Sequence, residues 1–373
     1  MSVTHKLNGI EGLREYFKNL LETGKIDEIL IPKLNSAKDN YVQALISDTG
    51  MLEDTNPFVP VIPVQTGRIA KNLTFTNSGK KLLIVCKPCE IKAIVELTKF
   101  KQVNLDNVFL VAVDCSGTYE LNDFQEILLN NSDYINNYTK LNAGGDLKSA
   151  DNFSFRKSCS MCTTLAIDAN MVDAVIGYYG ASGDELLLIA KDDSKLKDTF
   201  ESSEVDLSKR DEIINKIKDE KTRNKEDILK DFKSETSSLE GLQKLLSKCI
   251  RCHNCMVACP ICYCKECVFR SPTFDHSADM ITTWAERKGG MRMLENTMMF
   301  HLTRLNHMSS SCVACGLCSS ACPNDIDVST LFISTAENVQ KMLEYNAGAS
   351  FDEPAPVSTF RENELVVEAG TNE

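Results

Sequence analysis

The sequence predicts an α/β domain over residues 1–190, followed by a helical domain over residues 246–345. Three observations carry this prediction. Residues 81–85 and 108–113 are continuous apolar runs rich in β-branched side chains, as buried strands are. Residues 90–99 between them have the apolar spacing of a helix, so the three segments form a strand–helix–strand unit. The second half of the chain instead carries cysteines at short, repeated spacings.

The other elements of the α/β domain follow along the chain. Residues 12–21 form an amphipathic helix that ends at Gly24, and residues 28–31 form a short strand. Two more strands, 174–178 and 185–189, are separated by a glycine-rich turn.

Charged segments flank the helical domain. Residues 191–245 are dense in charges of both signs, which predicts a charged connector of solvated helices packed on the first domain. A tether that lets the second domain reach a partner is the alternative. Residues 346–373 are polar and acidic, and we expect them to form a tail, or an arm that becomes ordered on a partner.

Two cysteine runs share the pattern C-x2-C-x2-C-x3-C followed by proline. Their members are Cys249, Cys252, Cys255 and Cys259, and then Cys312, Cys315, Cys318 and Cys322. This pattern binds [4Fe–4S] clusters through thiolates, and the fourth cysteine of each run ligates the other cluster. Zinc sites use two C-x2-C pairs with a longer spacer, so they do not need a third cysteine within the same run. Disulfides do not suit a chain whose start lacks the features of a signal peptide. The runs therefore predict two clusters with exchanged fourth ligands.

A long insert separates the two runs. Its residues 278–308 have a helix-forming composition, with apolar side chains at helical spacing: Met291, Leu294, Met298, Leu302 and Leu305. This arrangement resembles the α-helical ferredoxin domain of the iron–sulfur subunits of succinate dehydrogenase and of the small cluster subunit of heterodisulfide reductase.

Four further cysteines lie at the ends of elements in the α/β domain. Cys89 and Cys115 each follow a predicted strand, and Cys159 and Cys162 form a C-x2-C pair in a loop. Strand ends meet at one edge of a sheet, so these four could close a third cluster. From spacing alone, a buried structural thiol is the alternative, for Cys115 in particular.

The first domain resembles the beta-subunit family of coenzyme F420-reducing hydrogenases and formate dehydrogenases. The resemblance lies in residues 85–91, 113–115, 157–162 and 173–177. The resemblance implies one [4Fe–4S] cluster at Cys89, Cys115, Cys159 and Cys162, beside a bound FAD. The chain has no GxGxxG fingerprint, so the flavin rests on the resemblance.

The flavin contacts implied by the resemblance lie in residues 65–68 and 87–88, and they are Thr66, Gly67, Arg68 and Lys87. For Arg68 and Lys87, a solvated surface charge is the alternative. A tryptophan typical of the family is missing from residues 177–185, which leaves the soluble hydride carrier open among deazaflavin, nicotinamide and none. No catalytic residue is identified.

Four cysteines remain: Cys86, Cys262, Cys264 and Cys267. They could form a fourth cluster, bind zinc or pack beside the other thiols. Among the histidines, His253 lies inside the first run and could hydrogen-bond near its cluster. His301 and His307 are expected to have surface or packing roles.

Composition limits the function. A net charge of -12 argues against nucleic acid and anionic membranes, and no apolar run is long enough to span a bilayer. Sixteen cysteines without an export signal predict a reducing, cytoplasmic setting, as in an anaerobe.

These parts predict an electron-transfer iron–sulfur flavoprotein subunit that is inactive alone. Clusters carry one electron each, whereas a flavin exchanges two with a hydride carrier. The expected partner is a formate dehydrogenase or hydrogenase catalytic subunit, with heterodisulfide reductase-like subunits as further carriers. A ferredoxin-like relay without flavin is the main alternative.

Overall fold

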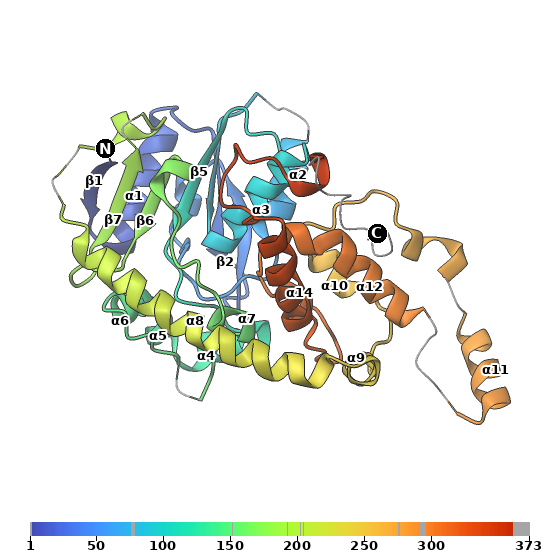
Figure 1. The fold of residues 1–373 in the computed structure, drawn as a ribbon. Coiled ribbons are helices and arrows are strands. Elements are labelled where there is room, and N and C mark those ends of the chain that lie inside the picture. Colours follow the sequence, from blue (N-terminus) through green and yellow to red (C-terminus); the bar gives the residue numbers. More distant parts are fainter. Residues whose placement is uncertain are drawn as a thin grey trace, which may run out of the picture.

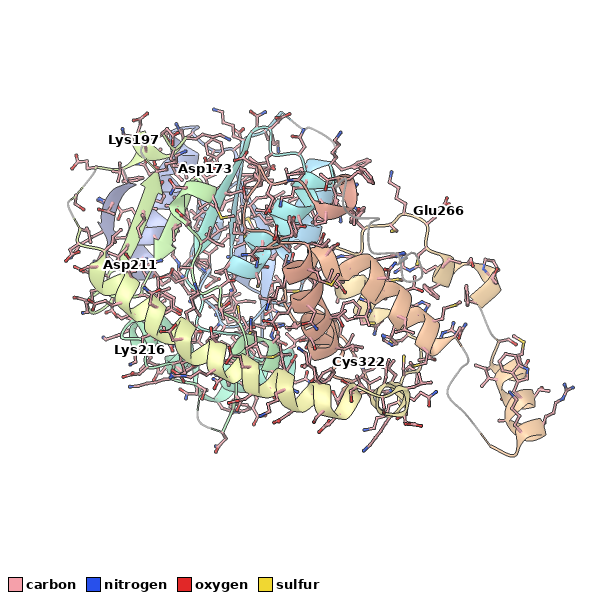
Figure 2. The ribbon with its side chains drawn as sticks, viewed as in Figure 1. Asp173, Lys197, Asp211, Lys216, Glu266 and Cys322 are labelled. Carbon is pink, nitrogen blue, oxygen red and sulfur yellow. The ribbon has the colours of Figure 1, made fainter. Side chains whose placement is uncertain are left out.

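The computed structural model describes residues 2–75, 79–150, 152–191, 193–201, 203, 205–274, 277–290 and 296–360. An α/β domain occupies one side of the molecule and a group of helices the other, and one long helix runs along both (Figure 1). In Figure 2, Asp173 and Asp211 mark the α/β side, and Cys322 and Glu266 mark the helical side. No helix in the described part of the chain is long and apolar enough to cross a membrane.

A mixed seven-stranded sheet forms the centre of the α/β domain, in the order β1-β7-β6-β5-β4-β2-β3. Its strands are β1 (Ser2–Leu7), β2 (Glu28–Leu34), β3 (Tyr41–Ile46), β4 (Leu82–Cys86), β5 (Val108–Val113), β6 (Ala174–Gly177) and β7 (Leu186–Lys191). Strands β2, β4, β5 and β6 are parallel, while β1, β3 and β7 pair antiparallel with their neighbours. The carboxyl ends of β4 and β5 therefore meet at one edge of the sheet.

The described helices are α1 (Gly9–Glu22), α2 (Thr66–Thr74), α3 (Pro88–Lys99), α4 (Leu121–Asn130), α5 (Ser132–Asn136), α6 (Tyr138–Asn142), α7 (Lys157–Ser160), α8 (Ser208–Thr236), α9 (Leu239–Leu246), α10 (Asn254–Ala258), α11 (Ala278–Lys288), α12 (Thr297–Met308), α13 (Leu317–Ser320) and α14 (Val328–Met342). Short 3-10 helices lie at Thr49–Leu52, Ala169–Met171, Lys197–Thr199, Val268–Arg270, Pro272–Phe274, Ser309–Ser311 and Pro356–Ser358.

Helices cover both faces of the sheet. Alternate residues of β4 face two cores: Leu83 packs with α1 and α4, whereas Ile84 packs with α2 and α3. This two-sided burial explains why β4 and β5 are apolar without alternation.

The central strands and α1 and α3 lie where the sequence predicts them, but the edge strands β1 and β3 were missed. β1 is polar over Thr4–Lys6, and β3 is only partly buried along its length. Edge strands bury one face at most, so they lack the continuous apolar signal of a central strand.

The insert forms two helices where one helical segment over 278–308 was expected. Helix α11 ends at Gly289, whose φ of 72° is left-handed, a conformation that glycine adopts without strain at a helix end. Helix α12 carries Met298, Leu302 and Leu305, of which Leu305 is buried and Leu302 is exposed. Met291 and Leu294 lie outside the described residues.

Helix α8 links the two halves of the molecule. Its first half buries Ile217 in a core of the α/β domain. Its second half buries Leu229 with Met161 and Ile333, and Phe232 in the core of the helical part. At the far end of the chain, the Tyr345 hydroxyl and the Gly348 amide donate to Glu96 of α3, while residues 361–373 lie outside the described part.

Arg210 fixes the start of α8 to the sheet. Its Nη2 donates to Asp114 Oδ1 at 2.6 Å, and Nη1 donates to the other carboxylate oxygen. Asp114 is fully buried at the end of β5 and also accepts from the Tyr178 amide at 2.9 Å. The pair therefore supports the strand end that leads to Cys115.

We expect Arg210→Leu to destabilise the chain by about 3–5 kcal/mol, because it leaves a buried carboxylate without its cation. Urea unfolding followed by circular dichroism measures the loss. Lys209→Ala, on an exposed neighbour, should change stability by no more than about 0.5 kcal/mol. An Arg210→Leu value as small as that of the control would contradict the role given to the pair.

Candidate metal centres

Both cysteine runs have the same backbone course. The second residue after the first cysteine is left-handed in each run, with φ of 54° at Arg251 and 57° at Ala314. The fourth is left-handed too, with φ of 63° at His253 and 77° at Gly316. Because L-residues rarely adopt this conformation, its repetition indicates one loop shape selected twice for the same purpose.

The fourth cysteine of each run lies with the first three of the other run. One cavity is lined by Cys249, Cys252, Cys255 and Cys322, which we name the outer quartet. A second cavity is lined by Cys312, Cys315, Cys318 and Cys259, the middle quartet. This is the exchange that the motif predicts.

The four cysteines of the α/β domain also lie together. Cys89 is in the first turn of α3, Cys115 follows β5, and Cys159 and Cys162 lie in and just after α7. Burial, then the charges of Glu90 and of Cys315, Cys115 and Cys162, raises the pKa of Cys89 well above its ordinary value. Cys115 is likewise within electrostatic reach of Cys159 and Cys162. We name Cys89, Cys115, Cys159 and Cys162 the inner quartet.

Basic side chains mark the boundary between the inner and middle quartets. Arg156 is buried, with its Nη2 3.9 Å from Cys159 Sγ, and its Nη1 donates to Ser320 Oγ at 3.3 Å. The Arg156 pKa is lowered by burial but raised overall by charges that include Cys159, Cys89 and Cys315. The guanidinium therefore acts on both quartets.

Gly316 brings the same two quartets into close approach. A Cβ on Gly316 would lie 1.9 Å from Ser158 Oγ, next to Cys159 in the inner quartet. Only glycine leaves room for α7 at this distance.

Arg304 of α12 lies between the middle and outer quartets. It is 3% exposed, and its Nη1 donates to Cys255 Sγ at 3.1 Å. Burial lowers its pKa, but Cys255, Cys259 and Cys318 raise it further, so the net pKa is raised and the charge is kept. The order of the sites is therefore inner, middle, outer, and the outer quartet ends at Cys252, which is exposed.

Most thiols in the quartets have a raised pKa, so they ionise less readily than an ordinary cysteine when no metal is bound. Burial raises the pKa of Cys255 and Cys312 to about 11, and that of Cys115 and Cys315 to about 12. Cys159 differs, because Arg156 and a hydrogen bond with Thr118 outweigh burial and lower its pKa. Since thiolates are the ligand form, loading a cluster must displace protons from these sites.

His301 is buried beside the outer quartet, so of the two expected roles, surface or packing, the surface role does not apply. Its Nε2 lies 3.4 Å from Cys249 Sγ. Burial, then Arg304 and His253, lowers the His301 pKa to about 4, so the ring is neutral at neutral pH and one ring nitrogen carries a hydrogen. His253 instead stacks on Phe300 at 4.8 Å, and its Nε2 has no hydrogen-bond partner among the described residues.

Over the described ranges, no three His, Cys, Asp or Glu side chains close on a point as one metal ion requires.

A cavity of about 390 Å³ lies between the two halves of the molecule. Its walls come from the start of α2, from α10 and α13, and from Arg156. Ala258 and Leu317 in these walls precede Cys259 and Cys318 of the middle quartet. The cavity therefore lies beside the middle quartet, and its wall residue Arg156 connects it to Cys159 of the inner quartet. It combines apolar walls with a few polar groups, as ligand sites do.

Of the four residues expected to contact a flavin, Arg68 lines this cavity and donates to the Cys259 carbonyl at 3.3 Å. Thr66 and Gly67 lie behind the wall, where the Thr66 amide donates to Glu90 Oε1 at 3.0 Å. Lys87 is buried and donates to the Pro57 carbonyl at 3.2 Å. Arg156, which the sequence did not single out, lines the cavity as well.

Two family models match the chain. Residues 245–326 match a 4Fe-4S dicluster domain. Residues 79–207 match the C terminus of the coenzyme F420 hydrogenase/dehydrogenase beta subunit. The F420-dependent formate dehydrogenase subunit beta of Methanocaldococcus jannaschii is 28% identical over 365 residues, which cover 89% of this chain and 90% of that protein.

Residues 79–207 are thus similar to the C-terminal part of coenzyme F420 hydrogenase/dehydrogenase beta subunits. A second relative, the F420-dependent formate dehydrogenase 1 subunit beta of Methanococcus maripaludis, is 26% identical over 371 residues, covering 91% of this chain and 90% of that one. With a beta-subunit domain and a dicluster domain, the chain is an electron-transfer subunit of an oxidoreductase.

A chain of the F420-reducing [NiFe] hydrogenase complex from Methanosarcina barkeri aligns with 64% of this chain and 94% of its own length, at 11% identity and a TM-score of 0.45.

Proposed function

We propose that this beta subunit binds FAD and three [4Fe–4S] clusters and carries electrons between a hydride carrier and a catalytic subunit. The observation that supports this most is the succession of inner, middle and outer quartets, with a ligand-sized cavity beside the middle quartet that Arg156 links to the inner one. A flavin converts a two-electron hydride exchange into the single-electron steps that clusters conduct.

The three quartets are the proposed cluster ligands. Thiolate ligation fits their content of four cysteines each. Arg156 and Arg304 would counter the negative charge of adjacent clusters, since each is buried and contacts a quartet thiol or its neighbour. His301 would donate a hydrogen bond to the Cys249 sulfur, which orients that ligand.

The cavity beside Arg68 and Arg156 is the proposed flavin site. Both guanidiniums line it, and the Nε of Arg156 has no hydrogen-bond partner among the described residues. Two arginines in the wall of a largely apolar cavity suit an anionic or carbonyl-bearing ligand. Gln65 orders the wall, because its side chain accepts from the Gly67 amide and donates to the Cys89 carbonyl at 3.4 Å.

The relatives' names suggest a formate dehydrogenase catalytic subunit as the partner, with deazaflavin F420 as the soluble carrier. The outer quartet, with Cys252 exposed, is the proposed exit toward the catalytic subunit or toward heterodisulfide reductase-like carriers. We place the complex in the cytoplasm of an anaerobe and expect the beta subunit to be inactive alone.

Flavin and iron analysis of the anaerobically purified chain tests the proposal. We expect about one FAD, released by acid and identified by chromatography, together with at least about twelve irons, four for each of three clusters. If the purified chain contained iron but no FAD, the flavin role would be wrong and the chain would act as a ferredoxin-like relay.

Replacing Arg68 by glutamine should weaken FAD binding by roughly tenfold or more, because a hydrogen bond to a charged group contributes about 1.5–3 kcal/mol. Titration of FAD into the flavin-depleted chain measures the change. Lys71→Gln is the matched control, since Lys71 lies one turn further along α2 and does not line the proposed flavin cavity. If the two variants bound FAD with equal affinity, the assignment of the flavin to this cavity would be wrong.

A further inference from the structure

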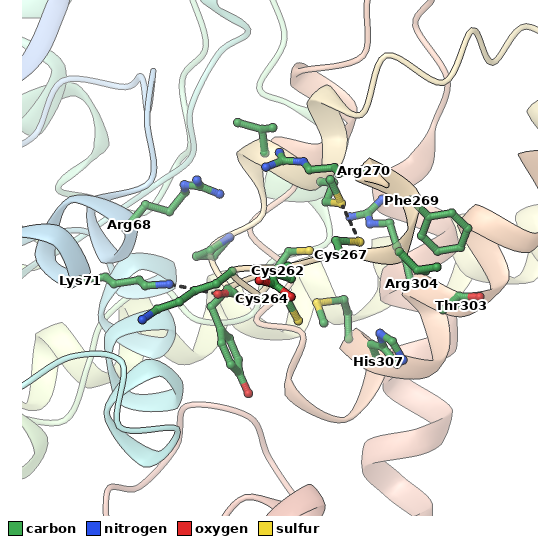
Figure 3. Close-up of a pocket in the computed structure, with 18 of the residues that line it drawn as sticks. Arg68, Lys71, Cys262, Cys264, Cys267, Phe269, Arg270, Thr303, Arg304 and His307 are labelled. Atoms are coloured by element: carbon green, nitrogen blue, oxygen red, sulfur yellow. Dashed lines mark hydrogen bonds between the residues drawn. The ribbon is translucent and has the colours of Figure 1, made fainter. Parts of the chain in front are cut away.

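Three cysteines outside the quartets line a cavity of their own. Cys262, Cys264 and Cys267 lie on the loop that follows Cys259, at the wall of a cavity of about 430 Å³ (Figure 3). Burial raises the pKa of Cys262 to about 11, and the charges that act on it include Cys259, Cys264 and Cys267. Cys267 Sγ lies 3.9 Å from Met256 Sδ. Four sulfur-bearing side chains are thus gathered beside the middle quartet.

Cys86 is not part of this group. It ends β4, is 2% exposed, and packs in the core between the sheet and α3. The charges that act on its thiol are those of Glu90 and Lys87. A set built from Cys86 and the three loop cysteines, which the sequence left open, therefore does not form in this fold.

The cavity is strongly basic. Five cationic side chains line it, against one carboxylate, that of Glu266: Arg68, Lys71, Lys265, Arg270 and Arg304. Lys71 also donates to the Tyr263 carbonyl at 3.2 Å, so α2 holds the middle of the cysteine loop in place. A positive surrounding favours thiolates over thiols, and with them an anionic metal centre.

We propose that Cys262, Cys264 and Cys267 bind a fourth [4Fe–4S] cluster, whose fourth iron faces this cavity. Binding releases the three thiol protons and forms three iron–sulfur bonds, with iron and sulfide supplied as for the other clusters. The cavity wall also carries His307, which is the fourth ligand that a Cys3His zinc site would use, so zinc is the alternative that the metal count must exclude.

The position of this cluster gives it a role. Its ligand Cys262 lies against Cys259 of the middle quartet, so the two clusters are neighbours. One electron can pass between them, with the middle cluster oxidised as the fourth is reduced. The open iron and the basic cavity make the fourth cluster a branch that could bind a small anionic ligand, off the line from the inner to the outer quartet.

Cofactor counting on the full-length chain, purified without oxygen, tests the proposal. Wild type should contain about sixteen irons and sixteen sulfides, against about twelve of each for three clusters. Cys264 is exposed, so Cys264→Ser should spare the packing and remove about four irons while FAD stays bound. Cys86→Ser is the matched control and should leave the iron count unchanged.

About twelve irons in wild type would overturn the fourth cluster, as would about one zinc per chain that Cys264→Ser removes. If Cys264→Ser does not fold, the native mass of wild type counts the clusters directly. A failure of the proposed flavin function can be told apart from a failure of the fourth cluster. A chain with about sixteen irons but no FAD would contradict the flavin role and leave the fourth cluster in place.

Discussion

Replacing Arg304 by glutamine should lower the reduction potentials of the outer and middle clusters by roughly 60 mV or more, a tenfold change in a one-electron equilibrium. Reduction adds negative charge to a cluster, and a buried cation stabilises the reduced form most. Arg304 donates to Cys255 Sγ at 3.1 Å and to the Cys255 carbonyl at 3.2 Å, and it acts electrostatically on Cys259 and Cys318. Its charge therefore faces ligands of both clusters.

Redox titration followed by electron paramagnetic resonance measures this shift. Arg304 lies over the rings of Phe300 and Phe332, at 5.5 and 4.8 Å from their centroids, so Arg304→Lys tests charge apart from stacking. The lysine variant should keep most of the potential. Arg270→Gln, which removes an exposed cation from the neighbouring loop, should leave both potentials in place. Unchanged potentials in Arg304→Gln would show that the guanidinium only packs.

The sequence predicted most of the elements that hold the quartets, for a physical reason. Two-sided burial makes β4 and β5 continuously apolar, and Cys89 and Cys115 follow these strands at one sheet edge. The two cysteine runs are local patterns, so their loops could be recognised without knowledge of the rest of the fold. The inner quartet needed a family resemblance as well, because its members come from separate loops.

The charged groups around the quartets could not be predicted in the same way. Arg304 and His301 lie 49 and 52 residues from the cysteines they contact, and no spacing rule connects them. Arg156 lies three residues before Cys159, but its importance arises from the approach of α13, which brings Ser320 to it. The contact made by helix α8 could not be predicted from sequence either. The many charges of α8 indicated exposure, whereas the structure shows that Arg210 forms an ion pair with the buried carboxylate of Asp114.

Substituting Cys259 by serine should remove the middle cluster and not the outer one. Cys259 belongs to the first run by sequence, yet it lines the cavity of Cys312, Cys315 and Cys318. We expect a loss of about four irons, with the signal of the outer cluster and the bound FAD retained. Electron delivery from the inner side to the outer cluster should then be lost, because Arg156 interacts with the inner and middle quartets and Arg304 with the middle and outer ones, which places the middle quartet between the other two.

Cys322→Ser supplies the mirror image of this experiment. Cys322 belongs to the second run but lines the cavity of Cys249, Cys252 and Cys255, so its loss should remove the outer cluster and spare the middle one. Stopped-flow reduction from the flavin side should then still reach the middle cluster in Cys322→Ser but stop at the inner cluster in Cys259→Ser. Electron paramagnetic resonance of the two variants identifies which cluster each has lost. If each variant lost the cluster of its own run, the exchange of ligands would be wrong.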